Sequence, residues 1–510
     1  MTLPEKKRLA EIAEEQGDNG IKKLQEFIHG KKDKLQLNAM HSVPLSEALE
    51  KFYLSRIGQT SQRENNGRAI NNQLNIARHA FNPYSHTPYF AGSSIKGAIR
   101  TALLNAQNDS ESLQSILNEL RIKDKNNRPI VVNDKIPIPK NVNGKLQEHL
   151  LGYQAISDNP EKGIKGDPLR LLKIGDATYS HPDNLNAAEI RFAVNRKNKP
   201  AKQQQSMAES KGLNQLLECL PANRSRSLTF DMTFLVEQNS TYRWALSEIC
   251  KACKEFFVPQ LERELAMLQH MNYAKTDWAR GLEKLLANEL GDAFGNQQAF
   301  LLRIGQHGGA ESNTLDGVRH IHIPQHKKYL PKPTTIWLAA DYKDQKDNLL
   351  PFGWVLVEIG DFISDKTHAF LKTQGAPDYQ RHEQLQSLAT QRAEFLAKKQ
   401  QKRELQAQQD AEDAEQERLK QAAEEAKAAQ MAAMTPAQQA IYVLQQEYLA
   451  AKTRAPEANG TLRQLLTQTI NQAGDWTPAE KQALWETGNE LCTFWGKPKK
   501  LKDQLKSLQS

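Results

Sequence analysis

Two cationic side chains, Lys96 and Arg100, lie four residues apart in the stretch PYFAGSSIKGAIRTALL, residues 88–104. Residues at this spacing share one face of a helix, so both cations are predicted to point outward together. An apolar stripe at helical spacing predicts that another face packs inward. Its residues are Ile95, Ala98, Ile99, Ala102 and Leu103. Two cations one helical turn apart suit a phosphate group.

The residues around these cations predict how the helix begins. Gly92 allows a sharp turn, and Ser93 or Ser94 supplies a hydroxyl at the predicted N-cap. Free backbone N–H groups at that end, beside a glycine that another backbone can approach, suit phosphate binding. Lys96 is followed by Gly97 rather than by Ser or Thr, so the stretch is not a P-loop. The alternative is a well-capped helix with two solvated cations.

A second candidate region is residues 300–323, FLLRIGQHGGAESNTLDGVRHIHI. An apolar strand carries Arg303 into a glycine-rich loop that contains His307. The loop glycines are Gly305, Gly308 and Gly309. Backbone amides of such a loop can form a nest for phosphate, so Arg303 and His307 are predicted ligand contacts.

Histidines in this region raise the question of a metal or a catalytic pair. His320 and His322 are two residues apart on a predicted strand and therefore point the same way. Only Glu311 and Asp316 are near in sequence as further ligands, so we expect no metal site. A histidine such as His307 or His320 acting as acid and base is the catalytic alternative.

Composition indicates a soluble protein with an anionic partner. The chain has 510 residues and a net charge of +8, with 39% hydrophobic and 25% charged residues. No apolar run approaches the ~20 residues of a membrane span, and the N-terminus lacks a signal-peptide core. We therefore expect a cytoplasmic protein with no membrane partner. Cys250 and Cys253 form a CxxC without a second pair, which favours two thiols on one helix face over zinc.

Periodicity and composition divide the chain into four expected parts. These are a helical N-terminal segment (1–57), a mixed region (58–378), a long charged helix or tether (379–434) and a small helical module (435–510). Within the mixed region we expect helices over 108–121 and 241–290, a short strand or hairpin over 129–139, and strands over 190–194, 227–236, 331–341 and 350–360. Capping boxes at Thr435 and Thr477, each with proline at the next position, predict two helix starts in the last module.

Several motifs together resemble one family. GSSIKGAIR, residues 92–100, resembles the G-S-S-[IL]-K-G-[AV]-[IL]-R motif of the RAMP superfamily, the RNA-binding proteins of CRISPR effector complexes. The glycine-rich loop resembles the C-terminal loop of the same family. DPLRLLKIGDA, residues 167–177, and the strands over 331–341 and 350–360 resemble elements of the RAMP subunit that terminates type III-A complexes. The helical start of the chain departs from the family pattern, which opens with a strand.

The resemblance implies an α+β fold with ferredoxin-like (RRM-like) units, helical insertions and an all-α C-terminal extension. It implies a non-catalytic role without a cofactor, closing the filament of backbone subunits at the crRNA 3′ portion. The implied partners are crRNA, the backbone RAMP subunit, the small subunit and host nucleases. The implied RNA contacts are Gly92, Ser93, Ser94, Lys96, Gly97, Arg100, Arg303, Gly305, His307, Gly308 and Gly309.

Two other classes of function remain open from the sequence. One is an endoribonuclease that matures the guide RNA with a histidine as acid and base. The other is a protein-only scaffold that holds its complex through apolar surfaces and the C-terminal helices.

Overall fold

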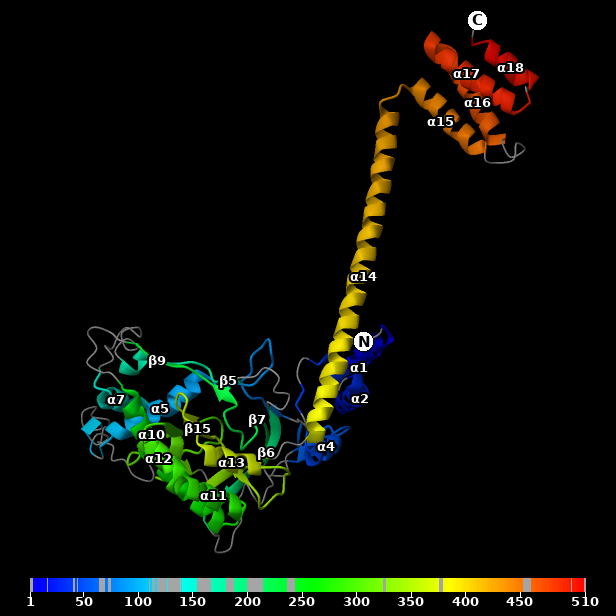
Figure 1. The fold of residues 1–510 in the computed structure, drawn as a ribbon. Coiled ribbons are helices and arrows are strands. Elements are labelled where there is room, and N and C mark those ends of the chain that lie inside the picture. The colour runs from blue at the N-terminus through cyan, green and yellow to red at the C-terminus, as the bar shows by residue number, and fades with distance from the viewer. Residues whose placement is uncertain are drawn as a thin grey trace. The chain divides into compact units, whose positions relative to one another are not determined.

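The computed structural model describes residues 3–508 apart from 16, 40–41, 44, 64–68, 72–74, 110, 112–114, 117–125, 127–137, 139, 154–166, 180–187, 200–213, 236–243, 324–326, 376–378, 453–459 and 497. The chain forms two compact units, Met1–Phe395 and Leu396–Ser510 (Figure 1). The boundary between the units falls inside the long helix α14 (Tyr379–Ala432). Most of the strand or hairpin expected over 129–139 lies outside the described residues, as does most of the helix expected over 108–121.

The first unit opens with helices. They are α1 (Leu3–Glu14), α2 (Asp18–Gly30), α3 (Lys32–Asn38) and α4 (Glu47–Leu54). Ser46 caps α4, because its Oγ accepts the backbone N–H of Leu49 at 3.2 Å. Leu49 is buried in the main core, and Phe52 packs edge-on against Phe192 at 5.5 Å between ring centroids.

A five-stranded sheet has the order β14-β13-β6-β7-β3. Its strands are β3 (Ile76–Ala77), β6 (Glu189–Lys197), β7 (Asn214–Cys219), β13 (Thr335–Ala340) and β14 (Leu350–Pro351). Only the β3–β7 pair is parallel among these five strands. Along β6 the side chains alternate: Phe192 and Val194 enter the main core, and Ala193 joins a small apolar cluster with Leu217 and Phe352 on the other face.

The described residues also form five pairs of antiparallel strands outside this sheet. They are β1 (Ser61–Arg63) with β2 (Ala69–Asn71), β4 (Leu172–Ile174) with β9 (Met232–Phe234), β5 (Thr178–Tyr179) with β8 (Leu228–Thr229), β10 (Ala299–Arg303) with β15 (Trp354–Glu358), and β11 (Ile321–Ile323) with β12 (Lys328–Leu330). The single strand expected over 227–236 is two strands here, because β8 and β9 pair with different partners.

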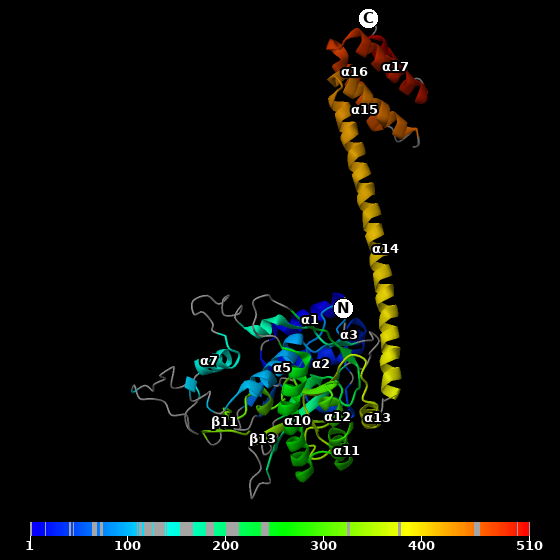
Figure 2. The same cartoon turned by 60° about the vertical axis from the view of Figure 1, so that its left-hand side comes forward.

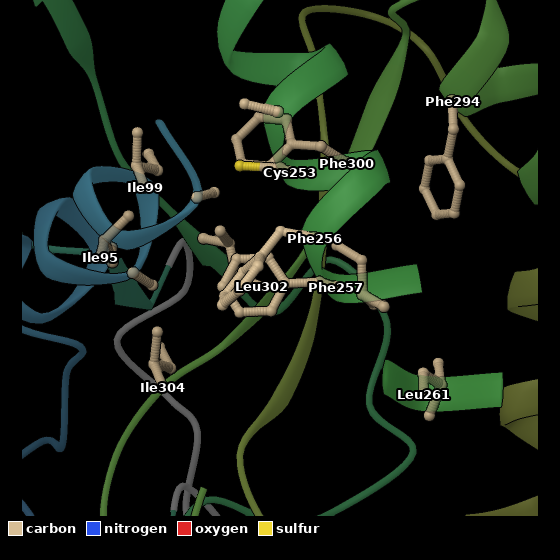
Figure 3. Close-up of a cluster of buried hydrophobic side chains, with 14 of the residues drawn as sticks. Ile95, Ile99, Cys253, Phe256, Phe257, Leu261, Phe294, Phe300, Leu302 and Ile304 are labelled. Atoms are coloured by element: carbon tan, nitrogen blue, oxygen red, sulfur yellow. The ribbon is translucent and has the colours of Figure 1, made fainter. Parts of the chain in front are cut away.

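The main core lies where α5 (Gly92–Gln107) packs on α10 (Leu246–His270) and β10, as Figures 2 and 3 show. The apolar stripe of α5, including Ile95 and Ile99, is buried against this helix, as its spacing predicts. Cys250 and Cys253 are buried free thiols in the same core. The unit also contains α7 (Lys140–Leu150), α11 (Thr276–Ala287), α12 (Glu289–Gly295) and α13 (Asp365–Gln374).

The second unit is helical. It contains most of α14, then α15 (Pro436–Ala451), α16 (Gly460–Gln472), α17 (Pro478–Phe494) and α18 (Lys499–Lys506). Both predicted capping boxes are confirmed, at Thr435 and Thr477. Leu405 and Leu419 of α14 are exposed, as expected for a solvated helix. None of the helices in the described part of the chain combines the length and apolar character of a bilayer crossing.

Candidate RNA interface

Helix α5 begins at Gly92, two residues earlier than an N-cap at Ser93 would allow. Its N-cap is Ala91, which offers no side-chain cap, so the prediction of a cap at Ser93 or Ser94 is wrong. Both serines lie in the first turn and are exposed. Their hydroxyls are therefore open to solvent instead of being used within the helix start.

The backbone that approaches Gly92 closely belongs to the protein itself and not to a ligand. A Cβ atom on Gly92 would lie 2.3 Å from the carbonyl oxygen of Ile174, at the end of β4. The backbone N–H of Gly92 donates to Oδ1 of Asp176 at 2.7 Å. A carboxylate therefore already occupies this amide at the positive end of the helix dipole. Gly92 explains how α5 docks on β4, and a ligand at this amide would have to displace Asp176.

Lys96 is half-buried and turns toward β4. Its Nζ donates to the carbonyl oxygen of Leu172 at 2.8 Å. Burial lowers the pKa of Lys96, and the positive charge of nearby Lys173 lowers it further. Lys173 itself is exposed on β4. An ammonium group has three donors, so this bond to Leu172 leaves two for a ligand.

Arg100 bonds to side chains of its own chain. Its Nη1 donates to Oδ2 of Asp167 at 2.5 Å, and its Nη2 donates to Oε1 of Gln147 at 2.9 Å. Asp167 also accepts the N–H of Leu169 at 2.9 Å and so caps the 3₁₀ turn Pro168–Leu171. The prediction that Lys96 and Arg100 point outward together is wrong, because both side chains are partly buried and find polar partners in residues 147–172.

The exposed part of the α5 start is a strip of small residues. Ser93, Ser94 and Gly97 face solvent, and no heavy atom lies within 4 Å of the position that a Cβ on Gly97 would take. The charges of Lys173 and Arg100 both lower the pKa of Lys96, and the carboxylate of Asp167 opposes them. Small side chains thus adjoin a local surplus of positive charge.

The structure corrects the role expected of Arg303. This side chain is only 6% exposed, and Glu264 of α10 is 8% exposed beside it. Nη1 and Nη2 of Arg303 donate to the two carboxylate oxygens of Glu264, and Nε donates to the Phe352 carbonyl oxygen at 3.1 Å. The guanidinium also lies 4.7 Å from the ring centroid of Trp354. Arg303 is thus an internal counter-ion that holds α10 to β10, not a phosphate contact.

The glycine-rich loop after β10 uses left-handed backbone at three positions. Gly305 has φ +85°, His307 has φ +64° and Gly309 has φ +83°. Gly305 and Gly309 are exposed, whereas Gly308 is buried. The buried Ser312 hydroxyl donates to the Gly308 carbonyl oxygen at 3.0 Å and closes the loop. Gly305 and Gly309 therefore remain candidate contacts, whereas Gly308 serves the loop itself.

The His307 ring packs on the face of the five-stranded sheet that carries Ala193 and Trp337. Its ring stacks on Trp337, with 4.8 Å between centroids and 24° between planes, and its Nε2 lies 2.9 Å from Oε1 of Gln215. Burial lowers the pKa of His307, so the neutral imidazole is favoured. The ring is half-buried and offers only part of its surface to a ligand.

His320 and His322 both lie against Tyr329 of β12, with ring centroids 4.6 and 4.9 Å from that of Tyr329. Across the residues that the structure describes, no group of three or more His, Cys, Asp or Glu side chains could hold a metal ion. His320 and His322 point the same way, as predicted, and both rings pack on Tyr329.

The segment that follows the glycine-rich loop contacts α5 near its C-terminal end rather than at its start. The backbone N–H of Asp316 donates to Oδ1 of Asn105 at 2.8 Å, and Nδ2 of Asn108 donates to the Asp316 carbonyl oxygen at 2.6 Å. Along the helix axis, Asn105 is about 18 Å from Ser93. The segment that follows the glycine-rich loop thus anchors the C-terminal end of α5.

The sequence alone did not identify Lys173 and Asp176 as residues near the start of α5. Both lie in the DPLRLLKIGDA motif, and their proximity to α5 depends on the fold of β4. One sequence signal does mark this surface. Residues 65–108 contain no Asp or Glu, although 60 of the 510 residues are acidic, so α5 and the segment before it carry only positive formal charge.

A comparison with protein-family models agrees with the motifs at residues 92–100 and 167–177. The model of the RAMP superfamily matches residues 57–268. Among solved structures, the chain is similar to a crystal structure of T. onnurineus Csm5, with 14% identity, a TM-score of 0.33, and coverage of 55% of this chain and 73% of that one. It is also similar to a chain of a Csm-crRNA-target RNA ternary complex in a type III-A CRISPR-Cas system, with 16% identity, a TM-score of 0.24, and coverage of 54% and 73%.

A search of curated proteins finds no match. The part of the chain that the family model matches runs from the strands before α5 to the end of α10, and it contains the GSSIKGAIR helix, the DPLRLLKIGDA motif and the central strands β6 and β7. Residues 57–268 of this chain are thus similar to the RAMP superfamily.

Proposed function

We propose that this protein is a non-catalytic, RNA-binding subunit of a type III-A CRISPR effector ribonucleoprotein. In this proposal it binds the 3′ portion of the crRNA, terminates the filament of backbone subunits and supports crRNA maturation. Its partners are crRNA, the backbone RAMP subunit, the small subunit and host nucleases. Ferredoxin-like units are part of the proposal. The observation that carries it is the exposed strip of Ser93, Ser94 and Gly97 beside a surplus of cations, within the RAMP region.

The chemistry of the strip suits an RNA backbone. The hydroxyls of Ser93 and Ser94 can donate to phosphate oxygens, and Gly97 lets the sugar-phosphate chain come close because nothing fills the space beside it. Lys173 supplies an exposed positive charge, and Lys96 has two donors left. Such contacts carry no sequence information, so binding is expected to be sequence-tolerant and salt-sensitive.

The glycine-rich loop is a second proposed contact. Gly305 and Gly309 present exposed backbone, and His307 presents the free part of its ring. Arg303 and Gly308 support this loop from below and do not touch RNA in the proposal. Arg100 likewise acts indirectly, because it ties α5 to Asp167.

The test is RNA binding by the full chain at two salt concentrations. We expect Lys173→Ala to weaken binding and to reduce the slope of log affinity against log salt by about 1, because one phosphate contact is lost. Gly97→Ala should also weaken binding, although alanine fits the helix there. Lys284→Ala removes an exposed lysine of α11 and is the matched control.

The same assay separates the alternatives. If Lys173→Ala and Gly97→Ala bind as the wild type does, the α5 strip is not the interface. If the wild type cleaves the RNA, and His307→Ala or His320→Ala abolishes cleavage, the endoribonuclease replaces the proposal. If the wild type does not bind RNA at all, a protein-only scaffold replaces it.

A further inference from the structure

One large hydrophobic side chain in the RAMP region is almost fully exposed. Tyr84 is 92% exposed, whereas Leu419 on the solvated helix α14 is 61% exposed. Tyr84 lies in residues 80–89, here called the Tyr84 loop, which connects β3 to the start of α5. Its ring is therefore available to a ligand over nearly all of its surface.

Hydrogen bonds hold the tip of the Tyr84 loop in one shape. Oδ1 of Asn82 accepts the backbone N–H groups of Tyr84 at 2.8 Å and of Ser85 at 3.1 Å. The Asn82 backbone closes the turn, because its N–H donates to Thr87 and its carbonyl oxygen accepts from His86. The tip is thus a closed turn, and ordering it on binding would cost little further entropy.

The base of the loop is fixed to the sheet. Nε of Arg78 donates to Oε2 of Glu218 on β7 at 2.7 Å. The Arg78 guanidinium lies 4.0 Å from the ring centroid of Phe81, and Phe81 stacks with His86 at 5.7 Å and 25°. A bridge between Phe81 and Pro88 joins the two arms of the loop. Tyr84 therefore stands at the tip of an anchored loop.

The sequence around Tyr84 favours a polyanion over an ordinary protein surface. The loop lies within the acid-free stretch 65–108, and Ser93 of the α5 strip follows only nine residues after Tyr84. An exposed aromatic ring close in sequence to cationic phosphate contacts is a combination by which proteins hold single-stranded nucleic acid.

We propose that Tyr84 stacks on an unpaired base of the RNA whose backbone lies along the α5 strip. This inference rests on the proposed RNA-binding function and adds a base contact to its phosphate contacts. Stacking on a tyrosine ring tolerates any base, because every base has a π face. Tyrosine loses little rotamer freedom on binding, which suits it to this task.

The experiment compares Tyr84→Ala and Tyr84→Phe with the wild-type full chain on a labelled oligouridine and on the matching abasic RNA. Tyr84→Ala should lose about 5- to 150-fold in affinity for oligouridine with an unchanged salt slope. Tyr84→Phe should bind as the wild type does. On abasic RNA the three proteins should bind equally. Thermal unfolding of Tyr84→Ala should match the wild type, because the side chain is exposed.

Several outcomes would overturn the inference. Equal binding of Tyr84→Ala and wild type to oligouridine would show that the ring contacts no base, while salt-dependent wild-type binding would leave the proposed function standing. An equal loss on abasic RNA would indicate a backbone contact instead of stacking. Unchanged RNA affinity with lost binding to the backbone subunit would identify a protein contact. Absence of wild-type RNA binding would remove both proposals together.

Discussion

Arg303 and Glu264 form an ion pair inside the protein, with 2.9 Å between Nη2 of Arg303 and Oε1 of Glu264. The pair joins the end of β10 to the C-terminal half of α10 and lies next to the glycine-rich loop. Burial raises the pKa of Glu264, and the charge of Arg303 opposes that shift. Each charge is therefore tolerated in the core because the other is present.

Removing one partner should cost far more than removing both. We expect Arg303→Met to lower the free energy of unfolding by about 3–5 kcal/mol, because it leaves Glu264 buried and unpaired. Arg303→Met/Glu264→Leu should recover most of that loss. Urea unfolding of the full chain, followed by a probe in the first unit, measures both. A single variant within about 1 kcal/mol of wild type would contradict this account.

The Arg303→Met variant should also respond to pH. Burial raises the folded-state pKa of Glu264 above its usual 4.5, so the protonated form is stable in the core. The stabilisation from this protonation is full below the unfolded-state pKa and is lost as pH rises through the folded-state value. The variant should therefore be least impaired in mild acid, and the double variant should lack this dependence.

Gly92 and Gly97 lie in the same helix but should respond oppositely to alanine. Gly92→Ala should lower stability by about 1–3 kcal/mol, because its Cβ would lie 2.3 Å from the Ile174 carbonyl oxygen. Gly97→Ala should raise stability by up to about 1 kcal/mol, since it adds helix propensity in open space. Paired thermal melts test this. Similar melting temperatures for the two variants would mean that α5 does not dock on β4 in this way.

His307 should make stability depend on pH near neutrality. Burial lowers its folded-state pKa below the ordinary 6.5, and its ring faces the uncharged groups of Gln215, Trp337 and Phe352. Stability is therefore full above the unfolded-state pKa and falls as pH drops toward the folded-state value. The comparison is urea unfolding at about pH 8 and about pH 5.5 of wild type and His307→Asn, since asparagine tolerates the left-handed backbone. An equal drop in both would assign the effect to other histidines.

The capping boxes should stabilise the C-terminal unit. Thr435→Ala and Thr477→Ala should each cost about 1 kcal/mol, because each removes the acceptor for a first-turn amide of α15 or α17. Hydrogen bonds from Thr435, and then from Thr477, lower the pKa of Glu480. The stabilisation that the Glu480 carboxylate provides is therefore present above the unfolded-state pKa of 4.5 and is lost as the pH falls through the folded-state pKa. Circular dichroism melts of the full chain give the measurement. Unchanged melting of the C-terminal helices in both variants would rule out these caps as stabilising elements.

Local patterns predicted the elements better than they predicted the partners of charged side chains. The spacing of Ile95 and Ile99 identifies the buried face of α5, because periodicity depends only on neighbours in sequence. Arg303 ends a short apolar run, and this position predicts an exposed cation at the start of a loop. In the structure it pairs with Glu264, which lies 39 residues earlier in the sequence. The same limit applies to Arg100, whose carboxylate partner Asp167 follows 67 residues later.

The candidate site was predictable in its residue types but not in its geometry. Ser93, Ser94 and Gly97 are exposed, which leaves them available to a ligand as the motif implies. The use of the Gly92 amide by Asp176 could not be read from the motif, because it depends on how β4 docks on the helix. Tyr84 carries no motif, and its exposure appears only when the turn around Asn82 is built.

The attachment of α5 at both ends limits how its length can vary. Gly92 is held by Asp176 at the start, and Asn105 and Asn108 are held by Asp316 near the end. One inserted residue between these points would turn the rest of the helix by about 100° and shift it by about 1.5 Å, which would misalign one anchor. Insertions and deletions in related chains are therefore expected after Asn108 and not within α5.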